Sequence, residues 1–275
     1  MVAPWHASLD LEFSRRDAET ILSRRHHAGP LRIQKPLYPE GPGVCHAIIL
    51  HPPAGIVGGD QLAIDVNIGA GAHALLTTPG AGKWYRSAGA TAQQVNRLRV
   101  GAGGTVEWLP QEAIVFSGAI ARMQTTVDLE AGASFIGVET LCFGRRASGE
   151  RFERGNAALR TEINLAGVPL WRERGRIAGG TQLLDSPIGL AGFSVSSTVL
   201  VAGFDFVPEV LPACRTIVSN ESGAQYGLTQ MPKLLVGRYL GHSAEAAREW
   251  FIGLWRILRP ALTGCDALAP RIWST

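Results

Sequence analysis

The chain has 275 residues, of which 46% are hydrophobic and 18% charged, and its formal net charge is +3. A chain of this length and apolar content buries a sizeable core, while so small a charge, carried by scattered basic residues, predicts no nucleic-acid partner and no anionic membrane surface. Glycine makes up 33 of the 275 residues, about 12% against a usual ~7%, which favours many short strands joined by tight turns.

The first residues, MVAPWHASLDLEFSRRD, include acids and lack the apolar core of a secretory signal. No apolar run reaches the ~18 residues of a transmembrane helix. Four cysteines, Cys45, Cys142, Cys214 and Cys265, lie far apart with no C-x-x-C pair, which is typical of reduced, mostly buried thiols and not of a structural zinc site. We therefore expect a cytoplasmic protein without a membrane span.

An internal repeat follows. Three segments resemble one another, DVNIGAG at 65–71, RLRVGAG at 97–103 and TVDLEAG at 126–132. Their last glycines stand 103 − 71 = 32 and 132 − 103 = 29 residues apart. Apolar and polar residues alternate in each segment, as in a strand with one buried face, and the glycine provides the positive φ of a tight turn. A second strand is predicted after each turn, over residues 73–78, 105–109 and 134–139.

A strand–turn–strand unit that buries one face cannot stand alone, so neighbouring units must stack. Stacking in order along the chain produces a strand solenoid, or layered β-superhelix. An ordinary β-sandwich whose hairpins happen to look alike explains the same pattern. The spacing alone leaves both architectures open.

Strands continue in the second half, predicted over residues 158–165, 195–201, 219–222 and 233–239. Residues 244–258 have a helical period instead, because their apolar residues recur at i, i+3, i+4 and i+7. Ser243 is the expected N-cap, Glu245 lies in the positive first turn, and Pro260 is expected to end the helix. No Ser/Pro-rich linker divides the chain, so we expect a single domain over residues 1–275.

No motif of an enzyme stands out. The glycine-rich GAGK at 80–83 is not a phosphate loop, because Thr77 stands where G-x-x-x-x-G-K-[ST] requires its first glycine and Trp84 stands where it requires the hydroxyl. There is no G-x-S-x-G, and the seven histidines form no H-x-H or H-E-x-x-H spacing.

Three acids are candidates for a polar site. Asp60 closes a stiff loop, HPPAGIVGGD at 51–60, where it either caps local N–H groups or lies at the wall of a polar passage. Glu139 and Glu173 stand in apolar, strand-like sequence, so each lies on a wet face or is buried with a partner. The arginines at 172, 174 and 176 favour an ordinary ion pair for Glu173.

Several stretches together resemble one family, the UreD (UreH) urease accessory proteins. Besides HPPAGIVGGD they are GPL at 29–31, TTPGAGKWYRS at 77–87, EWLPQEAIVF at 107–116, GRRASGE at 144–150, PLWRER at 169–174, LRP at 258–260 and PRIWST at 270–275. They occur in order and span nearly the whole chain. The resemblance implies a mainly β fold, a superhelical stack of β-sheets, to which the helical period adds a C-terminal amphipathic helix. It thus favours the stacked architecture over the sandwich.

The resemblance also implies a function. The chain would be a non-enzymatic scaffold in a dimeric hetero-oligomer with UreF, UreG and the urease structural subunits, where it helps deliver nickel to apo-urease. An internal water-filled route would carry the Ni²⁺, so nickel is expected in transit and no cofactor is expected to be tightly bound. Carboxylates suit such transit, because clustered imidazoles or thiolates would hold nickel too tightly. The candidate route residues are Asp60, Glu139 and Glu173, with His51 as a fourth.

Two other functions remain open. The chain could be a β-fold hydrolase or metal-dependent enzyme that uses His51, Asp60 and Lys83. It could also be an adaptor that shares the partners of a conduit and passes no metal.

Overall fold

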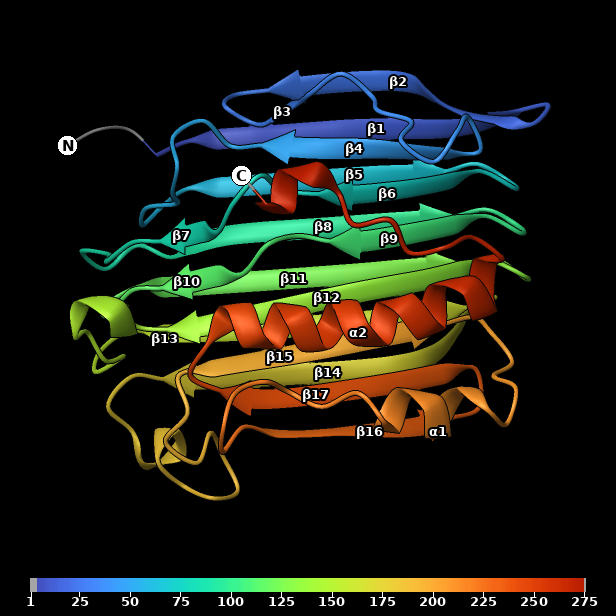
Figure 1. Ribbon diagram of the computed structural model, residues 1–275. Helices are drawn as coiled ribbons and strands as arrows, with labels where there is room; N and C mark the ends of the chain where they lie inside the picture. The colour runs from blue at the N-terminus through green and yellow to red at the C-terminus, as the bar shows by residue number, and fades with distance from the viewer. Residues whose placement is uncertain (1–3, 275) are drawn as a thin grey trace.

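The computed structural model describes residues 4–274, which form two facing β-sheets with a long helix on the outside of one of them (Figure 1). The first sheet has seven strands in the order β14-β13-β11-β8-β5-β1-β2. Its strands are β1 (His6–Arg16), β2 (Glu19–Ala28), β5 (Gln61–Ile68), β8 (Ala92–Val100), β11 (Ile120–Leu129), β13 (Asn156–Leu165) and β14 (Val168–Ala178).

The second sheet has ten strands, eight of them in the order β16-β17-β15-β12-β9-β6-β4-β3, with β7 and β10 continuing from β12. Its strands are β3 (Arg32–Ile33), β4 (Val44–Leu50), β6 (His73–Thr77), β7 (Gly82–Trp84), β9 (Thr105–Leu109), β10 (Ala113–Val115), β12 (Ser134–Phe143), β15 (Val195–Ala202), β16 (Gln225–Met231) and β17 (Leu234–Gly241). The helices are α1 (Val210–Arg215) and α2 (Ala244–Thr263), with short 3-10 turns at Arg146–Ser148, Gln182–Leu184 and Arg271–Ser274.

The repeat forms the centre of both sheets. The chain passes from a first-sheet strand through a turn to a second-sheet strand, and successive units pair in parallel, with Asp65 opposite Arg97 and Arg97 opposite Thr126. The turn glycines Gly71 and Gly103 have φ values of +66° and +65°, in the left-handed region that favours glycine. Parallel, in-register pairing confirms the stack of units and excludes a sandwich of hairpins for this part of the chain.

The structure corrects two predictions in the second half. Residues 219–222 are not a strand, because the Ser219 hydroxyl accepts the N–H of Glu221 and such a local bond favours a turn; the strand is β16 instead. The helix does not end at Pro260 but continues to Thr263, where Gly264 caps it with φ +69°. Burial of the preceding residues Leu258 and Arg259 holds the last turn against the loss of one helical hydrogen bond.

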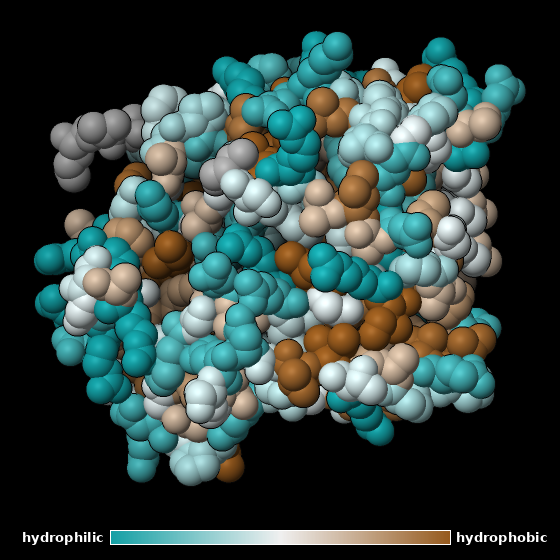
Figure 2. All heavy atoms as spheres, viewed as in Figure 1, coloured by the Kyte–Doolittle hydropathy of each residue, from teal (hydrophilic) through white to brown (hydrophobic). Residues whose placement is uncertain are grey.

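Helix α2 covers the outer face of the second sheet. Ser243 caps its N-terminus by accepting the N–H of Ala246, as predicted, and its buried stripe includes Trp250, Leu254 and Trp255, packed in one cluster with residues of β15 and β17. The helix is amphipathic, and among residues 4–274 no helix is long and apolar enough to cross a membrane. Hydrophobic atoms also gather on the surface around α1 and α2, at the lower right of Figure 2.

A buried ionic cluster joins this helix to the repeat. The carboxylate of Glu107, on β9, is fully buried and accepts the Nε–H of Arg259 at 2.9 Å and the Nε1–H of Trp255 at 2.7 Å. The Nε2 atom of His73 lies 2.7 Å from the same carboxylate, and Arg259 also bonds Glu40 at 2.9 Å. Burial alone would raise the pKa of Glu107, but His73 and Arg259 lower it below its ordinary value, so the carboxylate stays ionised.

Replacing Arg259 with Met should lower the free energy of unfolding by about 3–5 kcal/mol, because it leaves the buried charge of Glu107 without its main partner. Urea unfolding followed by tryptophan fluorescence measures the loss. The matched control is Arg256→Met on the exposed side of α2, which should change the value by less than about 0.5 kcal/mol. Equal effects of the two substitutions would show that the buried pair is not what holds the helix.

Candidate functional site

One line of polar side chains crosses the otherwise apolar inner face of the first sheet. Asn96 on β8, Thr125 on β11, Thr161 on β13 and Glu173 on β14 stand directly opposite one another in the register. On one side of this line the inner positions are apolar, for example Val127 and its neighbours in the central core, and on the other side Gln94 adds a further amide on β8. Parallel pairing of β8, β11 and β13, and antiparallel pairing of β13 with β14, therefore turn four separate polar residues into one row.

A shorter row faces it from the second sheet. Glu139 on β12, Thr198 on β15 and Arg238 on β17 are opposite one another in that register. Arg238 joins the two sheets, because its Nη2 lies 2.8 Å from the Oε1 of Glu173 and its Nη1 donates to the Thr198 hydroxyl at 2.7 Å. We call these seven residues the polar layer: Asn96, Thr125, Thr161, Glu173, Glu139, Thr198 and Arg238.

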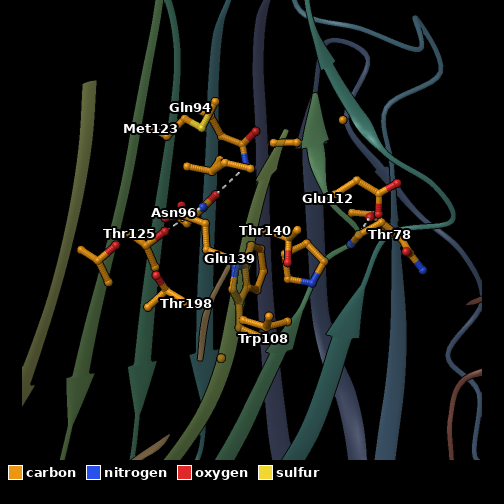
Figure 3. A pocket seen from close by; sticks show the side chains of 18 of the residues that line it. Thr78, Gln94, Asn96, Trp108, Glu112, Met123, Thr125, Glu139, Thr140 and Thr198 are labelled. Carbon is orange, nitrogen blue, oxygen red and sulfur yellow. Dashed lines mark hydrogen bonds between the residues drawn. The ribbon is translucent and has the colours of Figure 1, made fainter. Parts of the chain in front are cut away.

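A cavity of about 130 Å³ lies between the sheets along this layer. Figure 3 places Asn96, Thr125 and Glu139 around it, and the side-chain amides of Gln94 and Asn96 and the Thr125 hydroxyl form a hydrogen-bonded chain with lengths of 3.0 and 3.1 Å. The volume is enough for several water molecules, and polar walls of this kind hold water where apolar ones stay dry. On the other side of the cavity in Figure 3 lie Thr78 and Glu112, and Gln111 is also among the lining residues.

Glu139 is the one acid of the polar layer that lines the cavity itself. Within residues 4–274 its carboxylate makes no hydrogen bond or ion pair, whereas Glu173 is paired with Arg238. Burial, and secondly the charge of Glu173, raise the pKa of Glu139 to about 7, while Arg238 acts in the opposite direction. The carboxyl is therefore poised between neutral and charged forms near neutral pH and exposes oxygen atoms to the cavity.

The structure separates the four predicted site residues into two pairs. Glu139 and Glu173 both belong to the polar layer. The partner of Glu173 is Arg238 and not one of its sequence neighbours, because adjacent residues on a strand point to opposite faces; Arg172 and Arg174 instead pair with the outward-facing Glu162.

The second pair, His51 and Asp60, does not line the cavity. Asp60 is fully buried and accepts the backbone N–H groups of Trp5 at 2.7 Å and Val57 at 2.9 Å, which is the capping role considered for it. Burial lowers the pKa of His51 while the charge of Asp60 opposes that shift, and within the described residues the buried His51 Nε2 has no hydrogen-bond partner. Whether both pairs belong to one route stays a prediction.

The geometry gives little support to the alternative of an enzyme that uses His51, Asp60 and Lys83. Lys83 lies in the short strand β7, which pairs with β10, whereas the lysine of a phosphate loop opens a helix. Both Asp60 oxygens are occupied by backbone N–H groups, so this carboxylate is not free to act as a general base. Among residues 4–274, no three His, Cys, Asp or Glu side chains come together as a metal cluster.

The sequence contains a further signal for the polar face of β8. Gln94 and Asn96 occupy the same face of β8 as the buried Leu98 and Val100, so they interrupt an apolar alternation with amides. A polar residue at an inward position of a repeat indicates an internal polar site. Thr198 and Arg238, by contrast, take their places from long-range pairing of β12, β15 and β17.

Glu139→Gln should make the protein more stable at pH 8 and less sensitive to pH. The pKa of Glu139 is about 7 in the folded protein against an ordinary 4.5, so the native state binds the proton more tightly than the unfolded chain. Its contribution is fully present below about pH 4.5 and is lost as the pH rises to 7, on the order of 1–3 kcal/mol.

Urea unfolding between pH 5 and 8 measures the difference between wild type and variant. Glu153→Gln, at an exposed position, is the control and should leave the pH profile unchanged. Parallel profiles for wild type and Glu139→Gln would refute the raised pKa.

Comparisons with known proteins agree with the sequence motifs. A sequence model described as UreD urease accessory protein matches residues 6–274. A urease accessory protein UreD of Azoarcus sp. (strain BH72) is 56% identical over 271 residues, covering 98% of this chain and 94% of its own length. That of Dechloromonas aromatica (strain RCB) is 54% identical over 274 residues, with 98% and 95% covered. On these grounds the chain belongs to the UreD family of urease accessory proteins.

Proposed function

We propose that this chain is a non-enzymatic scaffold of urease activation that also conducts Ni²⁺ toward the dinuclear site of apo-urease. It would work in the cytoplasm, in a dimeric hetero-oligomer with UreF, UreG and the urease structural subunits. The nickel is its cargo, and no tightly bound cofactor is needed. Family membership supports the role in urease activation, and the polar layer supports the conduit.

The observation that carries the conduit is the polar cavity, lined by Glu139 with amides and hydroxyls, that lies in the largely apolar core between the two sheets. Burying amides, hydroxyls and a carboxylate between two sheets costs stability unless water or partners satisfy them, so such a row has a use beyond folding. Carboxylate, hydroxyl and amide oxygens bind Ni²⁺ weakly enough to release it, and waters complete its coordination. Glu112, which also lines the cavity, offers the next carboxylate along the way, whereas the Gln111 oxygen already accepts the guanidinium of Arg248 at 2.6 Å.

Asp60 and His51 would serve a second part of the route. The unpartnered Nε2 of His51 is a potential nickel ligand next to a buried carboxylate, but Asp60 is already committed to two backbone N–H groups. Its contribution to the conduit would therefore be the negative potential of its charge and not direct ligation.

The scaffold role has its own support on the surface. Hydrophobic atoms concentrate around α1 and α2 (Figure 2). Partly buried apolar side chains such as Leu211, Ile217 and Ile257 pack here against the apolar cluster between α2 and the second sheet. Apolar surface that is gathered in one place favours a protein partner. An adaptor that passes no metal would use the same surface, and only the interior distinguishes the two.

The double substitution Glu139→Gln/Glu173→Gln should lower the nickel content of co-expressed urease several-fold while assembly with UreF, UreG and urease stays intact. It removes the negative potential along the layer and leaves Arg238 uncompensated, which raises the barrier for a dication. Pull-down of the accessory complex and metal analysis of the recovered urease are the two measurements. Asp60 is left in place, because its loss would also leave the N–H groups of Trp5 and Val57 unsatisfied.

Glu162→Gln is the matched control, since this acid faces outward on β13 and pairs with arginines on that face. It should leave nickel loading at the wild-type level. Normal loading by the assembled double variant would reject the conduit and leave the adaptor.

A further inference from the structure

The ion pair between Glu173 and Arg238 lies next to the lining of the cavity. Thr161 and Thr198 are among its lining residues, and the next strands outward, β14 and β17, carry Glu173 and Arg238 in the same rows. Strand β14 is the edge of the first sheet. The two side chains are 33% and 46% exposed, so the pair stands between the cavity and solvent.

Arg238 occupies this position with three fixed contacts. Its guanidinium bonds the carboxylate of Glu173 and the hydroxyl of Thr198, at 2.8 and 2.7 Å, and its Cζ lies 5.8 Å from the ring centre of Trp171. The planar fork can bond two oxygen acceptors at once, one from each sheet. These oxygen atoms are also the ligands that a divalent cation would find at the outer end of the layer.

The charges at this end explain why the guanidinium of Arg238 and a divalent metal ion exclude each other. Glu173 and Glu139 bring up to two negative charges to this end, and both feel the charge of Arg238 or of each other. With Arg238 in place, the net charge left for a dication is at most −1, and the guanidinium repels it at short range. Without Arg238, two carboxylates, the Thr198 hydroxyl and cavity waters would form an oxygen site for a divalent metal ion.

We propose that Arg238 is the specificity-determining residue at the outer end of the polar layer. Its guanidinium takes the place of a divalent cation between Glu173 and Thr198, so a metal ion enters only when the side chain swings out, and the chain does not retain the ion. The proposal rests on the proposed conduit, to which it adds a tethered cation that returns after each passage and displaces the cargo.

The test is Ni²⁺ binding by the untagged protein, or by its accessory complex, carrying Arg238→Gln. Isothermal titration and equilibrium dialysis with NiCl₂ should show at least tenfold tighter binding than wild type, with one additional ion per chain. Adding Glu173→Gln or Glu139→Gln to the variant should remove the gain. Arg174→Gln is the control, because Arg174 follows Glu173 on β14 but faces outward toward Glu162. The Arg174→Gln variant should bind Ni²⁺ like wild type.

Arg238→Met, which is neutral and has no polar end, should show the same gain, and provides the measurement if the Gln variant does not fold. A folded Arg238→Gln or Arg238→Met variant that binds Ni²⁺ no more tightly than wild type overturns the proposal. So does a gain that persists without Glu139 and Glu173.

The two proposals fail in different ways. If Glu139→Gln/Glu173→Gln lowers nickel loading but Arg238→Gln retains no metal, the conduit stands and the role of Arg238 falls. If Arg238→Gln retains nickel while the double variant loads urease normally, the cation site stands and the conduit falls.

Discussion

The in-register parallel pairing of the repeat is the constraint on which the rest of the structure depends. A slip of one residue would move every inward side chain to the outer face, and it would break up the row from Asn96 to Glu173. The two repeat spacings, 32 and 29 residues, differ without disturbing this register. The longer unit has a longer connection before its next long strand. Seven residues, 85–91, join β7 to β8, whereas four residues, 116–119, join β10 to β11.

The second organising element is the buried cluster around Glu107 and Arg259. It connects the C-terminal helix to strand β9, 152 residues earlier in the chain, through the hydrogen bonds between Arg259 and Glu107. Two segments that carry the family resemblance also meet here, because Trp273 packs against Trp255 and donates its indole N–H to the Thr77 hydroxyl at 2.8 Å.

What could be predicted from the sequence follows from the range of the forces involved. The repeat, its turn glycines and the N-cap at Ser243 are local signals and were found. The second half was harder, because antiparallel strands without a repeat leave only composition to read, and residues 219–222 adopt a turn through a side-chain bond to the backbone. Glu139 and Glu173 were identified from their apolar, strand-like surroundings and the resemblance suggested their role, yet the predicted partner of Glu173 was wrong. The alternation of strand side chains already implied that its neighbouring arginines face the other way, whereas Arg238 is brought to it only by the packing of two sheets.

The register also gives the polar layer a length. Along the first sheet it spans four neighbouring strands, so Asn96 and Glu173 are separated by three interstrand spacings, roughly 14 Å at ~4.8 Å each. Beyond Asn96 the same row continues through Ile64 and Leu9, which are apolar, so nothing hydrophilic leads on toward β1. A hydrated ion that entered at the β14 edge would cross three of the six interstrand spacings, half the width of the sheet, before it had to turn toward Glu112 in the cavity lining. A conduit through the molecule would therefore be bent, with its corner where the amides of β8 give way to aliphatic side chains.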